Sequence, residues 1–308
     1  TIQYWMLLVA SMVQAAAFAI YLPARIAFNA QVVEHDQIGP AVVLSQTAQE
    51  AMRVIAPALA GVLIGSWFGV GGLFLMAAVT SMIAGVVLLG LPPGSPVNES
   101  HRSPLAEMAD AARYVRANRS LGLIALTTIG VVVIGFPYLT FLPALADDRY
   151  DVGAVGYGLM AGTAGLGAVC AGIVVPRRRW VVTSPWRTIT WSGALLGLAL
   201  IGLGLTQWFW LGLLMLAAVG ATGLVFQTTT QSLMLSLSDS EYHGRMQSMV
   251  VLGFSGFGLA ALPLGAFADA FTLELTMALM GVAVVGVTAA FTLKRRQHRR
   301  ELVAVELA

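Results

Sequence analysis

Long apolar stretches, separated by short polar segments, follow one another along nearly the whole chain. A helix needs about 20 apolar residues to cross the roughly 30 Å apolar core of a bilayer. The stretches reach this length and do not alternate with a period of two, which favours helices over strands. An open sheet edge would also leave backbone groups unsatisfied in lipid. The pattern predicts nine membrane-spanning helices, at residues 4–22, 39–66, 70–91, 121–146, 153–175, 187–206, 209–236, 246–270 and 274–293.

The composition indicates an all-α membrane protein and excludes an ordinary soluble domain. Hydrophobic residues make up 58% of the 308 residues and charged residues 10%, whereas soluble domains carry about 25% charged residues. The single cysteine, Cys170, allows no disulfide within the chain, and the sequence has no Cys/His cluster. We therefore expect no metal or other cofactor. The net charge of +2 does not indicate nucleic-acid binding, because the basic residues fall in loops.

The distribution of Arg and Lys orients the predicted helices, because the cytoplasmic loops of membrane proteins collect these residues. Fifteen of the 17 basic residues lie in alternate loops and in the tail, whereas the other loops contain only Arg149, and Arg53 lies inside a predicted span. We therefore expect the tail in the cytoplasm and Thr1 on the outer side. Only Lys294 is a lysine, a bias typical of GC-rich bacterial genomes. This predicts a multi-pass protein of the bacterial cytoplasmic (inner) membrane.

The longest polar segment separates three predicted helices from six. Within it, Ser103-Pro104 is typical of a helix N-cap followed by a proline at the first helical position. An apolar stripe follows, which predicts an amphipathic helix along the cytoplasmic surface. The odd count of three plus six, with Thr1 in place of Met, leads us to expect a missing N-terminal piece. The predicted parts are a truncated N-terminal bundle (1–91), a cytoplasmic linker (92–120), a C-terminal six-helix bundle (121–293) and a basic cytoplasmic tail (294–308).

Polar residues in the predicted helix 39–66 share one face. They are spaced by three or four residues, which places them in line along a helix: Gln46, Glu50, Arg53, Pro57 and Gly61. A charge at mid-membrane costs about 2.5–3.5 kcal/mol, so it must face protein or water. Glu50 is a candidate protonatable coupling residue, and Arg53 its partner or a substrate contact. The alternative is a structural ion pair that holds this helix in the bundle.

A second polar run, Gln227 to Ser232, lies inside the predicted helix 209–236. So many polar groups within a span are expected to line a cavity rather than face lipid. Gln227 and Gln231 are four residues apart on one face, and they are candidate substrate contacts. Hydrogen bonding between helices is the alternative. Gln14, Tyr138 and Thr140 are weaker candidates.

Two passages resemble a known family. The first runs from Ser45 to Gly61 and contains Arg53 followed by Pro57 and closely spaced small residues; the second is Glu241 to Ser248, with Pro263, Gly265 and Asp269 following. Both resemble the enterobactin-exporter and macrolide-efflux branch of the major facilitator superfamily. The first is similar to the antiporter motif of the fifth helix, with Ala56 where that motif has glycine. Here Ala60-Gly61 also stands in place of Gly-Gly.

The resemblance implies a major facilitator fold in which the nine spans correspond to helices four to twelve of twelve. The two halves of such transporters rock around a central site. It therefore implies a secondary active transporter, and we expect proton-driven efflux of an amphiphilic small molecule: a drug, a macrolide or a siderophore. The expected partners are this substrate and the lipid bilayer, and we expect a monomer. The proton gradient would supply the energy, with no cofactor.

Small residues on two helices are candidate gating elements. The resemblance implies that the helix with Pro57 and Gly61 meets the helix with Gly158 and Gly162 across the domain interface and slides against it. Ordinary close packing of small residues is the alternative. In the loop before residue 246, the charged residues Glu241 and Arg245 flank Gly244, and the three are a candidate cytoplasmic gate, because charged pairs at loop ends can favour one conformation. Helix capping and the positive-inside bias are the alternative explanation for these three residues.

The sequence also bears on other classes of function. All four His residues fall in loops or the tail, and no H-E-x-x-H motif occurs, so we do not expect an intramembrane enzyme. No G-x-x-x-x-G-K-[ST] phosphate loop is present, which argues against a primary pump. An importer of the same fold and a non-transporting fragment stay open as alternatives.

Overall fold

The computed structural model describes residues 69–90, 104–174, 184–238 and 243–306. Before residue 69 it describes only short stretches, at residues 5–6, 9, 12–14, 16–17, 21, 51–52, 55–56, 59–60 and 63–64. The chain divides into two compact units. One contains Thr1–Gln49 and Met76–His101, and the other contains Glu50–Leu75 and Arg102–Ala308.

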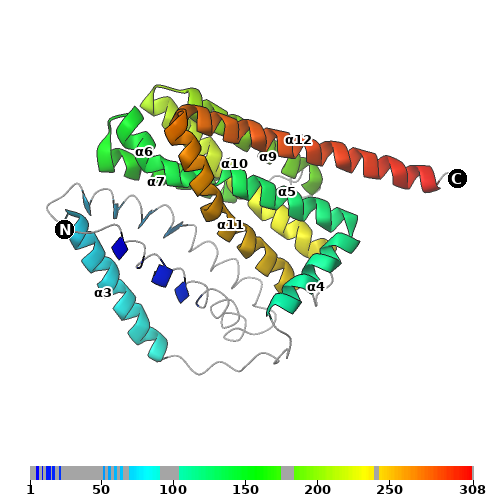
Figure 1. Ribbon diagram of the computed structural model, residues 1–308, viewed down its shortest axis with the longest axis horizontal. Coiled ribbons are helices and arrows are strands. Elements are labelled where there is room, and N and C mark those ends of the chain that lie inside the picture. Colours follow the sequence, from blue (N-terminus) through cyan, green and yellow to red (C-terminus); the bar gives the residue numbers. More distant parts are fainter. Residues whose placement is uncertain are drawn as a thin grey trace. The chain divides into compact units, whose positions relative to one another are not determined.

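The described residues form helices and no strand, as predicted from the apolar pattern (Figure 1). The elements are α3 (Gly69–Leu89), α4 (Pro104–Ala117), α5 (Arg119–Gly135), α6 (Tyr138–Ala144), a π-helical turn η2 (Leu145–Arg149), α7 (Gly153–Val174), α9 (Pro185–Leu205), α10 (Phe209–Leu237), α11 (His243–Ala270) and α12 (Leu273–Glu306). The helix predicted within the linker corresponds to α4 and begins at Pro104.

Within the described ranges, six helices are long and apolar enough to cross a membrane. They are Gly69–Leu89, Arg119–Arg149, Gly153–Val174, Pro185–Leu205, Phe209–Met234 and Leu273–Gln297. Each corresponds to one predicted span, with ends that differ by a few residues. A seventh predicted span, 246–270, lies within α11, whose part Gly258–Ala270 is a shorter apolar helix. Most of the predicted helices 4–22 and 39–66 lies outside the described residues.

The span Arg119–Arg149 is interrupted, although the sequence pattern predicts one continuous helix there. Pro137 has no backbone N–H, and its ring clashes with the carbonyl four residues earlier. The helix α5 therefore ends at Gly135. Hydrogen bonds to the residue three positions earlier, as in a 3₁₀ turn, follow it: the amide of Leu139 donates to the Phe136 carbonyl at 3.1 Å, and that of Thr140 to the Pro137 carbonyl at 2.9 Å. The interruption turns the residues around Pro137 away from regular helical positions.

The C-terminal bundle, α4 to α12, is held by long helix pairs. Helix α12 packs along α9, α10 packs along α7 and α9, and α5 contacts α11 and α12. Figure 1 shows α12 alongside α9 and then continuing beyond it toward the C-terminus. The 25-residue span of α12 ends at Gln297, so its last turns lie past the apolar segment.

Glycines set the distance between α9 and α12. A Cβ built on Gly197 would lie 2.6 Å from the Gly281 carbonyl oxygen, and one built on Gly281 would lie 2.5 Å from the Gly197 carbonyl oxygen. The two backbones therefore touch, as small residues permit in membrane helices. At one end of this pair, the Trp186 ring stacks on Phe291 at 5.9 Å and lies under the Arg295 guanidinium at 4.7 Å.

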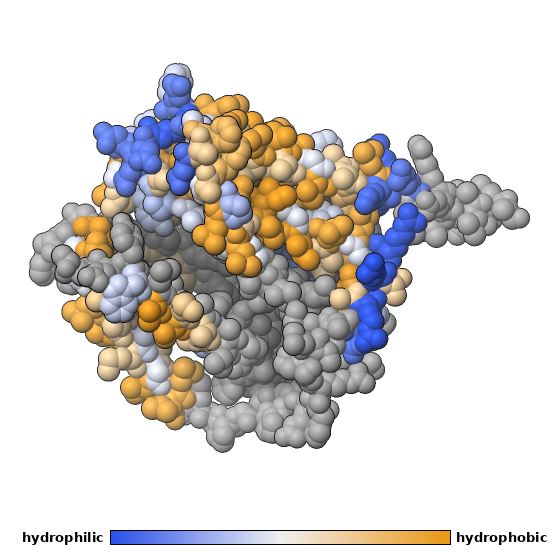
Figure 2. Space-filling view, viewed as in Figure 1, coloured by the Kyte–Doolittle hydropathy of each residue, from blue (hydrophilic) through white to orange (hydrophobic). Residues whose placement is uncertain are grey.

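Several buried hydroxyl groups in the bundle donate to carbonyls of their own helices. Thr128 donates to the Ile124 carbonyl at 2.9 Å, Ser192 to the Thr188 carbonyl at 2.7 Å and Thr288 to the Val284 carbonyl at 2.9 Å. This four-residue back-bonding lets a polar side chain sit inside an apolar bundle without a partner on another helix. Figure 2 shows apolar residues over the visible face of the bundle, with hydrophilic residues toward its two ends.

Candidate functional site

A partly open cavity of about 100 Å³ lies between helices of the C-terminal bundle. It is bounded by the interruption between α5 and α6 and by the facing sides of α7, α9 and α10. Its lining is mainly apolar or small, with a tyrosine and a glutamine as the polar side chains: Phe136, Tyr138, Leu139, Ala161, Ala164, Gly165, Ala168, Leu196, Val219, Gly220, Gly223, Leu224 and Gln227. The cavity therefore offers an apolar surface with two hydrogen-bonding positions.

The cavity lies near mid-depth of the spans that surround it. Ala164 is halfway along α7, Leu196 is halfway along α9, and Phe136 is near the middle of the span Arg119–Arg149. Polar groups at this depth are expensive unless they face protein or water. A polar side chain that lines a cavity here is therefore a candidate for binding a ligand.

The helix break at Pro137 creates one wall of this cavity. Phe136 and Tyr138, which flank the proline directly, and Leu139, two residues after it, all line the cavity. Tyr138 is buried, with 7% of its surface exposed. In a regular helix, successive residues are rotated by about 100°, so Phe136 and Tyr138 would point to nearly opposite faces. Because the helix is interrupted at Pro137, both can line the same cavity. Tyr138 is among the weaker candidates that the sequence indicates, whereas Phe136 and Leu139 are not predicted from the sequence. The sequence signal for these two residues is Pro137 inside an apolar run.

The opposite wall consists of α7 and α10 in backbone contact. A Cβ on Gly220 would lie 1.7 Å from the Ala164 carbonyl oxygen, and a Cβ on Gly167 would lie 2.0 Å from that of Ala217. Each helix thus presents an alanine and a glycine three residues apart to the other. Such close approach is available only to small residues. Ala164 and Gly220 also line the cavity, so the contact that joins the helices also shapes the cavity wall.

Gln227 is the polar side chain of α10 that reaches this cavity. The neighbouring hydroxyl groups bond to their own helix: Thr228 donates to the Leu224 carbonyl at 2.8 Å and Thr230 to the Phe226 carbonyl at 2.9 Å. In the described part of the chain, the Gln227 side-chain amide has no hydrogen-bond partner and is only half-buried. Gln231, one turn further on, is half-buried and has an interaction of its own. Of the two glutamines predicted as substrate contacts, Gln227 lines the cavity and Gln231 does not.

Several predicted site residues lie outside the described residues: Gln46, Glu50, Arg53, Pro57, Gly61 and Glu241. Gly244 and Arg245 lie in the first turn of α11. Gly158 and Gly162 are buried on α7. Two other glycines of that helix, Gly167 and Gly172, face α10. A Cβ built on Gly172 would lie 3.2 Å from the Leu224 Cδ2 atom of α10. Among the described residues, no three His, Cys, Asp or Glu side chains come together as metal ligands.

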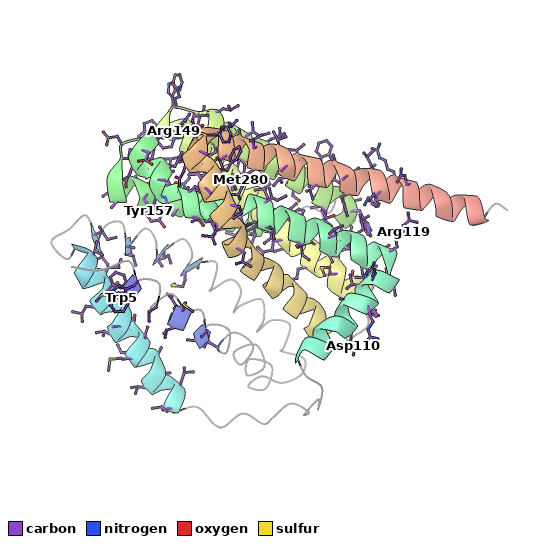
Figure 3. All side chains as sticks on the ribbon, in the orientation of Figure 1. Trp5, Asp110, Arg119, Arg149, Tyr157 and Met280 are labelled. Atoms are coloured by element: carbon purple, nitrogen blue, oxygen red, sulfur yellow. The ribbon has the colours of Figure 1, made fainter. Side chains whose placement is uncertain are left out.

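A second polar centre lies at one end of the same bundle, around Arg149 (Figure 3). Its guanidinium forms an ion pair with Glu274 at the start of α12, and its Nε donates to the Thr206 carbonyl at 2.8 Å. Next to it, the Tyr150 hydroxyl donates to the same carbonyl at 3.4 Å, and its ring meets Phe209 edge-on at 5.6 Å. Burial raises the pKa of Tyr150 above its usual value, which keeps this hydroxyl protonated. The end of η2, the connection between α9 and α10 and the start of α12 therefore meet at Arg149.

Comparison with known proteins gives three findings. The family model of the Major Facilitator Superfamily matches residues 1–263. The Staphyloferrin A transporter of Staphylococcus aureus (strain NCTC 8325 / PS 47) is 25% identical over 258 residues, which cover 81% of this chain and 62% of that protein. The structure of a bacterial metal transporter superposes with a TM-score of 0.58 at 16% identity, covering 84% of this chain and 66% of that one. The chain thus spans just under two thirds of both relatives, and the structural match shows a shared fold alone.

Proposed function

Because this chain belongs to the Major Facilitator Superfamily, we propose that it acts in secondary active transport of an amphiphilic small molecule by alternating access. The mid-span cavity with the Gln227 amide on its wall is the observation that carries this proposal. An amide inside a span that has no hydrogen-bond partner among the described residues is costly unless another group, water or a ligand satisfies it. A transported molecule that presents hydroxyl or carbonyl groups would complete its hydrogen bonds.

The lining suits a molecule with both apolar and polar parts. Phe136 and the small residues of α7 offer apolar contact, while Gln227 both donates and accepts hydrogen bonds. The cavity is smaller than the roughly 300–1,000 Å³ usual for drug-sized ligands, so it accounts for one portion of the substrate. Among a drug, a macrolide and a siderophore, we favour a siderophore, because the Staphyloferrin A transporter is a relative across most of this chain.

We propose proton-driven export as the direction, with Glu50 as the protonatable residue and Arg53 as its partner. The support is the sequence: the passage around Arg53 resembles an exporter motif, and no nucleotide-binding loop is present. A carboxylate within a span is a functional candidate by default because its charge is costly there. Import by the same fold is the second candidate, since the name of the relative states transport without a direction.

Transport in membrane vesicles tests these proposals. The full chain is expressed in a pump-deficient bacterium, and everted and right-side-out vesicles are offered staphyloferrin A, a macrolide and a fluorescent amphiphile. Gradient-dependent accumulation in everted vesicles, abolished by a protonophore, is the expected result for export. Accumulation only in right-side-out vesicles would show import. No gradient-dependent movement of any probe in either orientation would contradict transport by this chain.

The matched variants Gln227→Leu and Thr228→Val test the site. Gln227→Leu keeps the size of the side chain but removes its hydrogen bonds, so we expect KM to rise about three- to tenfold, the value of one neutral hydrogen bond. Thr228→Val removes a hydroxyl that bonds only to its own helix, and KM should change less than twofold. Equal KM values for the two variants would remove Gln227 from the substrate path.

A further inference from the structure

A second cavity, of about 290 Å³, lies between the beginning of α5 and the end of the α12 span. Six residues line it: Arg119, Gly122, Leu123, Leu126, Lys294 and Gln297. Two are cations and one is an amide, and the other three form an apolar or small floor. The transport site described above uses none of them, because its lining lies near mid-span.

This cavity lies at the depth of lipid headgroups. Arg119 begins a span of 31 residues that ends at Arg149, and at 1.5 Å per residue this span is roughly 46 Å long, about the thickness of a bilayer with its headgroups. Figure 3 shows Arg119 and Arg149 at opposite ends of the bundle. Lys294 lies roughly 30 Å along α12 from Leu273, at the edge of the apolar core. Both cations are therefore level with the phosphates.

The charged residues that line the cavity are both cations: Arg119, which has an interaction of its own, and Lys294. No carboxylate is among the lining residues. Within the described part of the chain, Lys294 has no acidic partner, whereas the nearby Arg113 is paired with Asp110. The next residue, Arg295, is engaged over the Trp186 ring. Lys294 is thus available to a ligand that brings its own negative charge.

The floor of the cavity distinguishes a lipid from a free anion. Leu126 is 65% exposed and Leu123 is half-buried. The two leucines are three residues apart and therefore lie on the same side of α5. Inorganic phosphate would gain nothing from these leucines, but the acyl chain below a phosphate headgroup would cover them. We propose that this cavity binds an anionic phospholipid, with its phosphate between Arg119 and Lys294 and its glycerol near the Gln297 amide. The proposal requires these helices to span a bilayer, and it is independent of the transported substrate.

Native mass spectrometry of the full chain, titrated in detergent with lipid, tests the proposal. The probes are dioleoylphosphatidylglycerol and zwitterionic dioleoylphosphatidylcholine, each with and without inorganic phosphate. We expect selective retention of the phosphatidylglycerol. Each basic residue near a membrane surface contributes about fivefold in affinity for anionic lipid, so the loss of both in Arg119→Gln/Lys294→Gln should weaken retention by about 25-fold.

The control is Arg116→Gln/Arg296→Gln, which removes the same charge from exposed neighbours that do not line the cavity. It should retain phosphatidylglycerol within about threefold of the unaltered chain. Both double variants are checked for monodisperse elution, and Lys294→Gln alone, at an exposed site, is the second test variant. Equal binding of the two lipids, equal losses in both double variants, or full displacement of the lipid by millimolar phosphate would each overturn the proposal.

Discussion

Arg149 pairs with Glu274, which follows it by more than a hundred residues in the chain, and the pair joins the end of the first span of the C-terminal bundle to the start of the last. The Arg149 side chain is 12% exposed and that of Glu274 is 38% exposed. Arg149 also holds the carbonyl of Thr206, in the connection between α9 and α10. One side chain therefore ties three connections together at one end of the bundle.

Replacing Arg149 should loosen this end of the bundle. Arg149→Met keeps the apolar stem of the side chain but loses the bond to a buried carbonyl and a partly exposed ion pair. We expect a loss of about 1–2 kcal/mol in stability, most of it from the hydrogen bond, because the exposed Glu274 carboxylate is screened by solvent. The measurement is the Tm of the purified chain in detergent. Arg187→Met, at an exposed arginine at the start of α9, is the control and should leave Tm unchanged.

Adding a methyl group at Gly220 should separate α7 from α10. The new Cβ would overlap the Ala164 carbonyl oxygen, which belongs to the backbone of α7 and cannot move without the helix. Overpacking of this kind costs about 1–3 kcal/mol, so Gly220→Ala should lower Tm and, through the cavity wall, also reduce transport. Gly286→Ala is the matched change on α12, where no atom lies within 4 Å of the built Cβ. If both variants show the same Tm, the close contact of α7 and α10 does not hold in the protein.

Neutralising Glu50 should uncouple transport from the proton gradient. Glu50→Gln keeps the shape and the hydrogen-bonding capacity of the side chain but cannot gain or lose a proton. We expect gradient-driven transport to fall to background while the protein stays in the membrane at its normal level. Arg53→Ala should reduce transport more than Gln231→Ala does. Unchanged, gradient-sensitive transport by Glu50→Gln would assign Glu50 a packing role.

Reporter fusions should show the C-terminus in the cytoplasm. Alkaline phosphatase is active only outside the cytoplasm, so a fusion after Asp151, in the loop that contains Arg149, should be active. A green fluorescent protein fused after Ala308 folds only in the cytoplasm and should fluoresce. The opposite pattern would reverse the orientation predicted from the Arg and Lys distribution.

The ends of the described membrane-spanning helices could be predicted to within a few residues, but their interruptions and contacts could not. The span containing Pro137 was predicted as one helix, since its apolar pattern continues through the proline. Which side chains the break turns inward depends on the neighbouring helices. Gln227 was predicted from its place in a polar run, and it lines the cavity. Gln231 was predicted with equal reason, and one helical turn was enough to place it elsewhere.

By itself, the sequence determined that this protein is a set of membrane helices, because the length and hydropathy of a segment are local properties that the bilayer selects directly. The tertiary structure decided which small residues became contacts. Gly167 and Gly220 bring two backbones together, whereas Gly286, equally small in the sequence, faces open space. It also decided that Arg149 meets Glu274, since pairing between distant residues depends on how the helices pack around one another, a property that no single segment contains.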